Sequence, residues 1–261
     1  RVPEWQIALI ACLRIGAVAI PCIEMLTGKD IGYRVVNSGA RAAICRAEHV
    51  GKLAEVEAAV PVRIAIGGAP GWLDYAAVTA AARDSIAAAD VGADDPAVMY
   101  YTSGSTGHPK GVLHASRGLY CWRMSAYYWL DLAPEDRIWC TADTGWSKAG
   151  TSIIWGPWSC GSAAFMYDGP FSPAERLRLL ARHRISVFCA ASTELFRLVD
   201  EDAKRHDLSA LRHAITAGEA LNAVVARRFE EVFGVKVAEA YGQTEALMMT
   251  LNLPSEPLRY G

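Results

Sequence analysis

The fold class is set by residues 97–111, Ala-Val-Met-Tyr-Tyr-Thr-Ser-Gly-Ser-Thr-Gly-His-Pro-Lys-Gly. Residues 97–102 are typical of a β-strand, and they lead directly into a loop rich in glycine, serine and threonine. Glycines let a backbone turn with its N–H groups facing inward, hydroxyls add donors, and Lys110 supplies a positive charge for phosphate oxygens. The stretch therefore predicts a phosphate-binding loop, with a polar surface turn as the alternative.

The loop differs from a Walker A sequence. That motif needs Gly-Lys-Ser/Thr at the start of a helix, whereas here Pro109 precedes Lys110 and the following residues, 111–114, are typical of a strand. The candidate phosphate-binding residues are Thr102, Ser103, Gly104, Ser105, Thr106, Gly107 and Lys110.

Helix and strand patterns alternate on both sides of this loop. Helices are predicted at 4–15, 27–39, 49–59, 74–82, 116–128, 153–158, 173–183, from 194, and at 223–233. Strands are predicted at 17–20, 42–45, 62–66, 97–102, 111–114, 137–141, 163–167, 187–190, 214–217 and 235–241. Strands spaced by helices predict an α/β fold with mostly parallel sheets flanked by helices. We expect a first βα subdomain in 1–90 and a second βα region, which contains the candidate phosphate-binding loop, in 91–261, connected through 83–96.

Two further motifs follow predicted strands. Residues 239–245 read Glu-Ala-Tyr-Gly-Gln-Thr-Glu, in which Glu245 is suited to Mg²⁺ and Thr244 to a phosphate; a solvated loop is the alternative. Residues 217–221, Ala-Gly-Glu-Ala-Leu, follow one strand and lead towards the next helix. The additional candidate ligand-binding residues are Gly218, Glu219, Ala220, Glu239, Ala240, Tyr241, Gly242, Gln243 and Thr244.

The three motifs resemble the T-S-G-[ST]-[ST]-G-x-P-K-G, G-E-[AP]-L and Y-G-x-T-E signatures of the adenylate-forming superfamily, in that order along the chain. That superfamily contains acyl-CoA synthetases, luciferases and non-ribosomal adenylation domains. The resemblance implies ATP, Mg²⁺ and CoA as ligands and a small carboxylic acid as substrate. It also implies that 91–261 is the ATP- and acyl-binding region. By the same resemblance, Lys110 contacts the β- and γ-phosphates, Thr244 the α-phosphate and Glu245 the Mg²⁺. Gly218, Glu219, Ala220 and Tyr241 frame the adenine.

Residues 1–5 and 141–146 are similar to the medium-chain and short-chain acyl-CoA synthetases. The similarity implies that Trp146, with Gly218 and Gly242, borders the acyl pocket; core packing is the alternative for Trp146. Packing in the core or at a subdomain interface is predicted for the other aromatic residues in this part of the chain: Tyr120, Trp122, Tyr127, Tyr128, Trp129, Trp155 and Trp158.

Composition and residue spacing argue against several other classes of protein. A formal net charge of −2 shows no excess of basic residues of the kind that binds nucleic acid. The apolar run at 7–21 is interrupted by Arg14 and Gly16 and is too short to cross a bilayer. Seven cysteines without a Cys-x-x-Cys pair predict small core residues in a reducing compartment, the cytoplasm or the mitochondrial matrix. The sequence contains no His-x-x-x-His pair, so it does not predict a zinc site. These features do not define an oligomeric state.

The sequence begins without Met and ends at Gly261, before the family's ribose-binding acidic residue and its C-terminal lysine-bearing domain. We therefore expect a fragment that is inactive alone. A non-catalytic nucleotide-binding or interaction module is one alternative function. Another is adenylation followed by transfer to a carrier-protein thiol instead of CoA.

Overall fold

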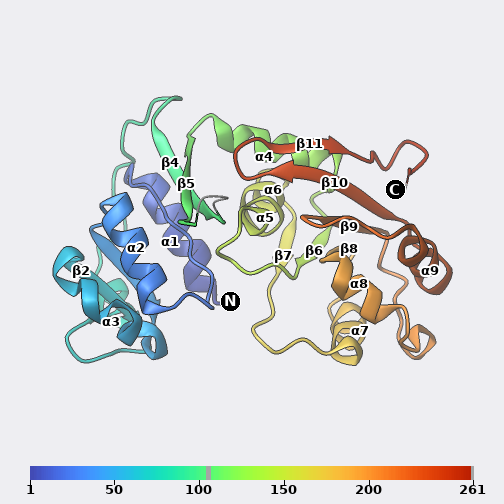
Figure 1. Ribbon diagram of the computed structural model, residues 1–261, viewed down its shortest axis with the longest axis horizontal. Helices are drawn as coiled ribbons and strands as arrows, with labels where there is room; N and C mark the ends of the chain where they lie inside the picture. Colours follow the sequence, from blue (N-terminus) through green and yellow to red (C-terminus); the bar gives the residue numbers. More distant parts are fainter. Residues whose placement is uncertain (104–106, 260–261) are drawn as a thin grey trace.

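A six-stranded sheet dominates the second half of the protein (Figure 1). The computed structural model describes residues 1–103 and 107–259. The sheet contains β6 (Arg137–Cys140), β7 (Ala163–Phe165), β8 (Val187–Cys189), β9 (His213–Ala217), β10 (Val237–Gln243) and β11 (Leu247–Leu251). Their order is β11-β10-β9-β8-β6-β7, and every neighbouring pair is parallel except β10 with β11.

Helices cover both faces of this sheet. They are α4 (Gly118–Tyr128), α5 (Ser147–Ala149), the π-helix η2 (Gly150–Trp155), α6 (Gly156–Cys160), α7 (Pro173–Arg182), α8 (Ser192–Leu198), the 3-10 helix η3 (Ala203–Arg205) and α9 (Ala223–Phe233). Side chains alternate across the strands: Trp139 and Phe188 pack with α7, α8 and α9, whereas Ile138 and Val187 pack with α4 and η2. Burial on both faces explains why the strands are almost continuously apolar.

The first half forms a smaller parallel sheet, ordered β1-β2-β3. Its elements are α1 (Pro3–Arg14), α2 (Gly28–Ser38), β1 (Ala42–Arg46), the 3-10 helix η1 (Ala47–Ala59), β2 (Val62–Ile66), β3 (Leu73–Asp74) and α3 (Tyr75–Ala80). Thr27 and Asp30 form the capping box expected at the start of α2, and Gly39 ends that helix in the left-handed conformation.

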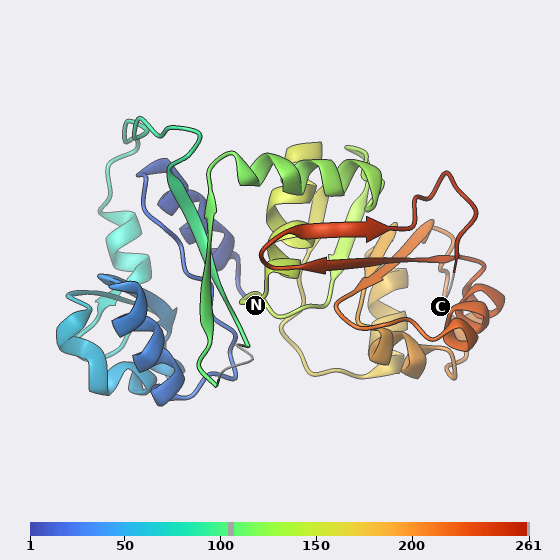
Figure 2. The same cartoon turned by 45° about the horizontal axis from the view of Figure 1, so that its top comes forward.

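An antiparallel hairpin of β4 (Pro96–Thr102) and β5 (Lys110–Ala115) lies between the two halves (Figures 1 and 2). A third apolar cluster joins it to both: Leu9 comes from α1, Tyr100 from β4, Trp122 from α4 and Ile154 from η2. The hairpin is thus packed between the halves. None of the helices in the described ranges, 1–103 and 107–259, is long and apolar enough to span a membrane.

The predicted α/β class and parallel sheets are confirmed, with three local corrections. The strand predicted at 17–20 is a single bridge between Ala19 and Val98, because Pro21 follows at once. The helix predicted at 153–158 belongs to a longer helical run over α5, η2 and α6. β11 was not predicted, because its residues follow a polar turn and carry no strict alternation.

Candidate nucleotide and acyl site

The carboxyl ends of β6, β8, β9 and β10 meet at one edge of the larger sheet, where ligands of open α/β sheets bind. Gly218 directly follows β9 with φ +98°, a left-handed backbone that favours glycine. Gly218, Glu219 and Ala220 are all exposed. The predicted adenine-facing segment therefore lies at this edge, open to a ligand.

Two motif carboxylates hold this segment in place. Glu239, on β10, accepts a hydrogen bond from the Leu221 backbone N–H at 2.7 Å. Glu219 accepts from both the backbone N–H (2.8 Å) and the hydroxyl (3.0 Å) of Thr193. Both contacts tie residues 218–221 to neighbouring elements, a positioning role that the motif alone did not reveal.

The second motif forms the end of β10 and the turn into β11. Gly242 lies so close to β11 that a Cβ atom would sit 2.1 Å from the Leu247 carbonyl oxygen, so only glycine fits. Thr244 and Glu245 follow in the turn. The Thr244 hydroxyl lies 3.2 Å from the Ser147 hydroxyl on α5, which joins this turn to the loop after β6. Glu245 is exposed, and among the described residues no cation pairs with it.

Tyr241 and Gln243 lie on one side of the same strand end. Tyr241 is half-exposed, and its hydroxyl accepts a hydrogen bond from the Gln243 amide at 2.8 Å. Ala240 is buried within the core of the sheet, so its side chain packs and does not face a ligand. Its predicted ligand contact can be made only by its backbone.

His114 is a buried histidine of the hairpin that was not predicted as a site residue. It lies on β5, buried, with its ring centroid 4.8 Å from that of Trp122. Burial lowers the pKa of His114, partly offset by the backbone of Thr244 and the carboxylate of Glu245, which raise it. Its strand position, in register with Val98, could have indicated burial but not the effect of the turn on its pKa.

The predicted phosphate loop connects the two hairpin strands, with Thr102 paired to Lys110. Gly104, Ser105 and Thr106 lie outside the described residues. Tyr33 of α2 supports the loop: its ring stacks on His108 at 5.1 Å, and its hydroxyl donates to the Pro109 carbonyl at 3.1 Å. Ser103, Gly107 and Lys110 are exposed, so the Lys110 ammonium is accessible to an anion.

Trp146 is 44% exposed and therefore is not a core residue. With Cys22, Arg34 and Tyr101 it lines a cavity of about 20 Å³ between the halves, room for about one water molecule. A Cβ on the preceding Gly145 would lie 2.1 Å from the Ile23 backbone nitrogen. Trp146 thus borders the junction between the halves; its contact with an acyl group stays a prediction.

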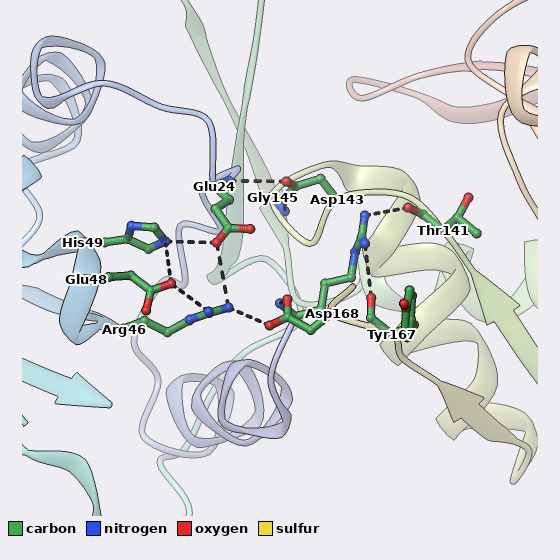
Figure 3. Close-up of polar contacts among 10 residues, drawn as sticks. Glu24, Arg46, Glu48, His49, Thr141, Asp143, Gly145, Tyr167 and Asp168 are labelled. Carbon is green, nitrogen blue, oxygen red and sulfur yellow. Dashed lines mark hydrogen bonds and ion pairs between the residues drawn. The ribbon is translucent and has the colours of Figure 1, made fainter. Parts of the chain in front are cut away.

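A network of charged groups lies beside this junction (Figure 3). Arg46 pairs with Glu48 at 2.7 Å, with Asp168 of the second half at 2.7 Å and with Glu24 at 3.8 Å. Glu24 also lies 3.1 Å from the His49 ring, a Glu-Glu-His grouping with metal-ligand chemistry. The Arg46 guanidinium already neutralises these carboxylates, so we interpret the group as an ion-pair network that bridges the halves.

Several expectations for aromatic and cysteine side chains were wrong. Trp122, Trp129 and Trp155 are buried as predicted, but the other four aromatic residues are about half-exposed or more: Tyr120, Tyr127, Tyr128 and Trp158. Those side chains point away from the faces of α4 and α6 that pack on the sheet, which spacing alone could not fix. Cys140 and Cys189 are buried core residues, whereas Cys22 and Cys121 are exposed.

Comparison with known proteins agrees with this geometry. The model of the AMP-binding enzyme family matches residues 1–260, so the chain belongs to that family. An uncharacterized acyl–CoA ligase of Bacillus subtilis, YtcI, is 38% identical over the whole chain, which covers 50% of that protein. The mitochondrial acyl-coenzyme A synthetase ACSM3 of Mus musculus is 34% identical, and the chain covers 46% of it.

A solved structure gives the same result for the fold. The anthranilate CoA ligase AuaEII, in complex with anthranoyl-AMP, matches 98% of this chain and 51% of its own, with a TM-score of 0.89 and 25% identity. The expected resemblance to acyl-CoA synthetases is confirmed. The chain spans about half the length of the relatives it matches.

Proposed function

We propose that this chain forms the ATP- and acyl-binding part of an acid–thiol ligase that activates a carboxylic acid as an acyl-adenylate for transfer to CoA. The observation that carries the proposal is the meeting of two of the motifs, 217–221 and 239–245, at one edge of the larger sheet. There the Thr244 hydroxyl lies 3.2 Å from Ser147, next to the exposed segment that starts at Gly218. The family match and the named ligases and synthetases among its relatives support it.

The reaction has two halves. The acid carboxylate attacks the α-phosphorus of ATP and pyrophosphate leaves; the CoA thiolate then displaces AMP. A carboxylate is a weak nucleophile and the phosphates repel it, so the protein must neutralise charge and align the reactants. Lys110 would contact the β- and γ-phosphates, Thr244 the α-phosphate, and the 218–220 backbone the adenine.

Glu245 is the residue that would hold a Mg²⁺ ion, and its chemistry fits that ion. Mg²⁺ is commonly held by one or two carboxylates together with phosphate oxygens and water. Glu245 is an exposed carboxylate in the turn beside Thr244, and among the described residues no cation competes for it. Glu245 would therefore hold the ion, whose charge would offset the negative charge of the phosphates.

Acid-dependent exchange of pyrophosphate into ATP tests the proposal, measured on this chain and on the full open reading frame that contains it. Lys110→Ala should slow exchange, because it removes about 2–4 kcal/mol of transition-state stabilisation. Lys204→Ala is the matched control, because Lys204 is an exposed lysine on η3. Equal exchange in the two variants would sink the assignment of Lys110.

Two further measurements test the role of Glu245 and the identity of the thiol acceptor. Glu245→Gln should shift the rate-against-Mg²⁺ curve to higher concentration without altering the circular dichroism spectrum. Identical curves would make Glu245 a solvated turn residue. Replacing CoA with a carrier-protein thiol as acceptor distinguishes the two acyl-transfer reactions.

A further inference from the structure

Lys148 is a cation at the carboxyl edge of the larger sheet that none of the three motifs contains. It lies on α5, two residues after Trp146. Its ammonium donates to the Ala217 carbonyl at 2.9 Å, at the end of β9, and to the Ala190 carbonyl at 3.4 Å, just after β8. The charge is therefore held between the ends of two central strands.

Within the described part of the chain, no acidic side chain neutralises this charge. Among residues 1–103 and 107–259, no carboxylate oxygen lies within 4.0 Å of the Lys148 ammonium. The buried cation Arg176, in the same half, is paired with Glu194 at 2.6 Å. Lys148 has no such partner among the described residues, so an anionic ligand can supply the opposite charge.

The ammonium also has a donor left. It carries three N–H groups, and the two carbonyls use two of them. The lysine is only partly buried, so the third is accessible. A partly buried cation with one unused donor suits a carboxylate oxygen, with which it forms a charge-assisted hydrogen bond.

The location defines which anion can reach it. The neighbouring Ser147 contacts Thr244, and the acceptor Ala217 directly precedes Gly218. Lys148 thus lies where the loop after β6, predicted to border the acyl group, meets both nucleotide motifs. An acid that attacks an α-phosphate held by Thr244 must bring its carboxylate to this position.

We propose that Lys148 binds a carboxylate oxygen of the acid substrate, an inference that rests on the proposed function. Its ammonium would offset the repulsion between the incoming carboxylate and the α-phosphate. While the carboxylate oxygen bonds to phosphorus and pyrophosphate leaves, Lys148 keeps its proton. Two carboxylates share this chemistry: the reacting group of any acid, or the second carboxylate of a dicarboxylic acid.

A purely structural role for Lys148 makes a different prediction. If the lysine only joins the ends of β8 and β9, a neutral side chain with N–H donors can replace it. Lys148→Gln keeps donors but loses the charge, whereas Lys148→Met loses both. Lys52→Gln is the matched control, because Lys52 likewise donates to a backbone carbonyl, that of Glu24 at 2.7 Å, in the first half.

The test measures pyrophosphate exchange against acid and ATP concentration in the full open reading frame, for monocarboxylic and dicarboxylic acids of matched length. Equilibrium binding of each acid is measured in parallel. Lys148→Gln and Lys148→Met should both lower kcat/KM for the acid about 10- to 100-fold, with the KM for ATP unchanged. Loss for every acid assigns the reacting carboxylate to Lys148; loss for dicarboxylic acids alone assigns the second one.

Other outcomes overturn the inference. Activity of Lys148→Gln equal to that of the unaltered protein, with loss only in Lys148→Met, would make the lysine a structural tie. A rise in the KM for ATP as large as that for the acid would assign the cation to the nucleotide. If the unaltered protein shows no exchange but Lys148→Gln still loses acid binding, the proposed function fails while the role of Lys148 stands; absence of both overturns both.

Discussion

The two sheets differ sharply in how completely they are covered. Every residue of β9, in the middle of the larger sheet, is buried, whereas no residue of β1 in the smaller sheet is. The nucleotide motifs at 218–221 and 239–245 extend from the buried sheet. The phosphate loop belongs to the hairpin, and Tyr33 of the first half supports it. The site therefore has one side on a densely packed sheet and the other anchored to a half with a thinner core.

The largest expected effect tests this difference in packing directly. Ile215 of β9 is 0% exposed and Ile44 of β1 is 40% exposed. Ile215→Ala should lower the free energy of unfolding by about 2–5 kcal/mol, because it leaves a cavity between the sheet and its helices. Ile44→Ala should cost about 1 kcal/mol or less. Chemical denaturation of both variants is the measurement, and equal losses would contradict the proposed difference in packing.

The next largest loss of stability is expected at Asp136, a buried charge in the second half. Burial would raise the pKa of Asp136, but hydrogen bonds from Arg212, the Ala133 backbone and Ser186 outweigh it and hold the pKa below its ordinary value of 3.8. The pair should therefore contribute stability above pH 4 and lose it as the pH falls through the folded-state pKa. Asp136→Asn should cost on the order of 2 kcal/mol at pH 7, because it leaves Arg212 without this partner.

Unfolding of both proteins between pH 7 and pH 3 checks the sign of this effect. The gap between them should be constant down to about pH 5 and then narrow. A gap that widens with acid would mean that the Asp136 carboxyl is protonated in the native state. Arg228→Ala is a control for a surface pair, because its contact with Glu231 is exposed on α9.

The sequence predicted the elements of the larger sheet well because burial on both faces leaves uninterrupted apolar runs, as at 187–190 and 214–217. It also placed the motifs at strand ends. There Gly218 adopts a left-handed backbone conformation, and Gly242 allows the close approach of β11. It did not predict β11, because residues 247–251 follow a polar turn and show no strict alternation. Nor did it single out Lys148, since its partners are the backbone carbonyls of Ala190 and Ala217, far away in the chain. Such tertiary contacts carry no local signal.

Substrate size provides a smaller effect, located at the junction of the halves. Trp146 follows Gly145 and lines the cavity with Tyr101 and Arg34. If the ring forms a wall of the acyl pocket, each methylene of a straight medium-length acid adds about 0.8 kcal/mol, roughly fourfold in kcat/KM. Trp146→Ala should shift the preference towards longer or bulkier acids. Profiles of kcat/KM against chain length that stay parallel, lowered equally at every length, would remove Trp146 from substrate recognition.

The smallest effect concerns how firmly the halves are joined. Arg46 lies 2.7 Å from Glu48 in its own half and 2.7 Å from Asp168 in the other, 122 positions along the chain (Figure 3). Double-mutant cycles on the two pairs should each give about 0.2–1 kcal/mol, because all three side chains are partly exposed. Arg46 and Glu48 stay close in the unfolded chain, so part of their interaction cancels on folding, whereas the Arg46–Asp168 interaction forms only when the halves meet. We therefore expect the larger coupling for Asp168, and we expect added salt to reduce it. A coupling near zero for Asp168 beside a measurable one for Glu48 would show that the Arg46–Asp168 pair does not help to join the halves. The contacts of Arg1 with Asp168 and Thr141, and the apolar cluster around Tyr100 and Trp122, would then join them.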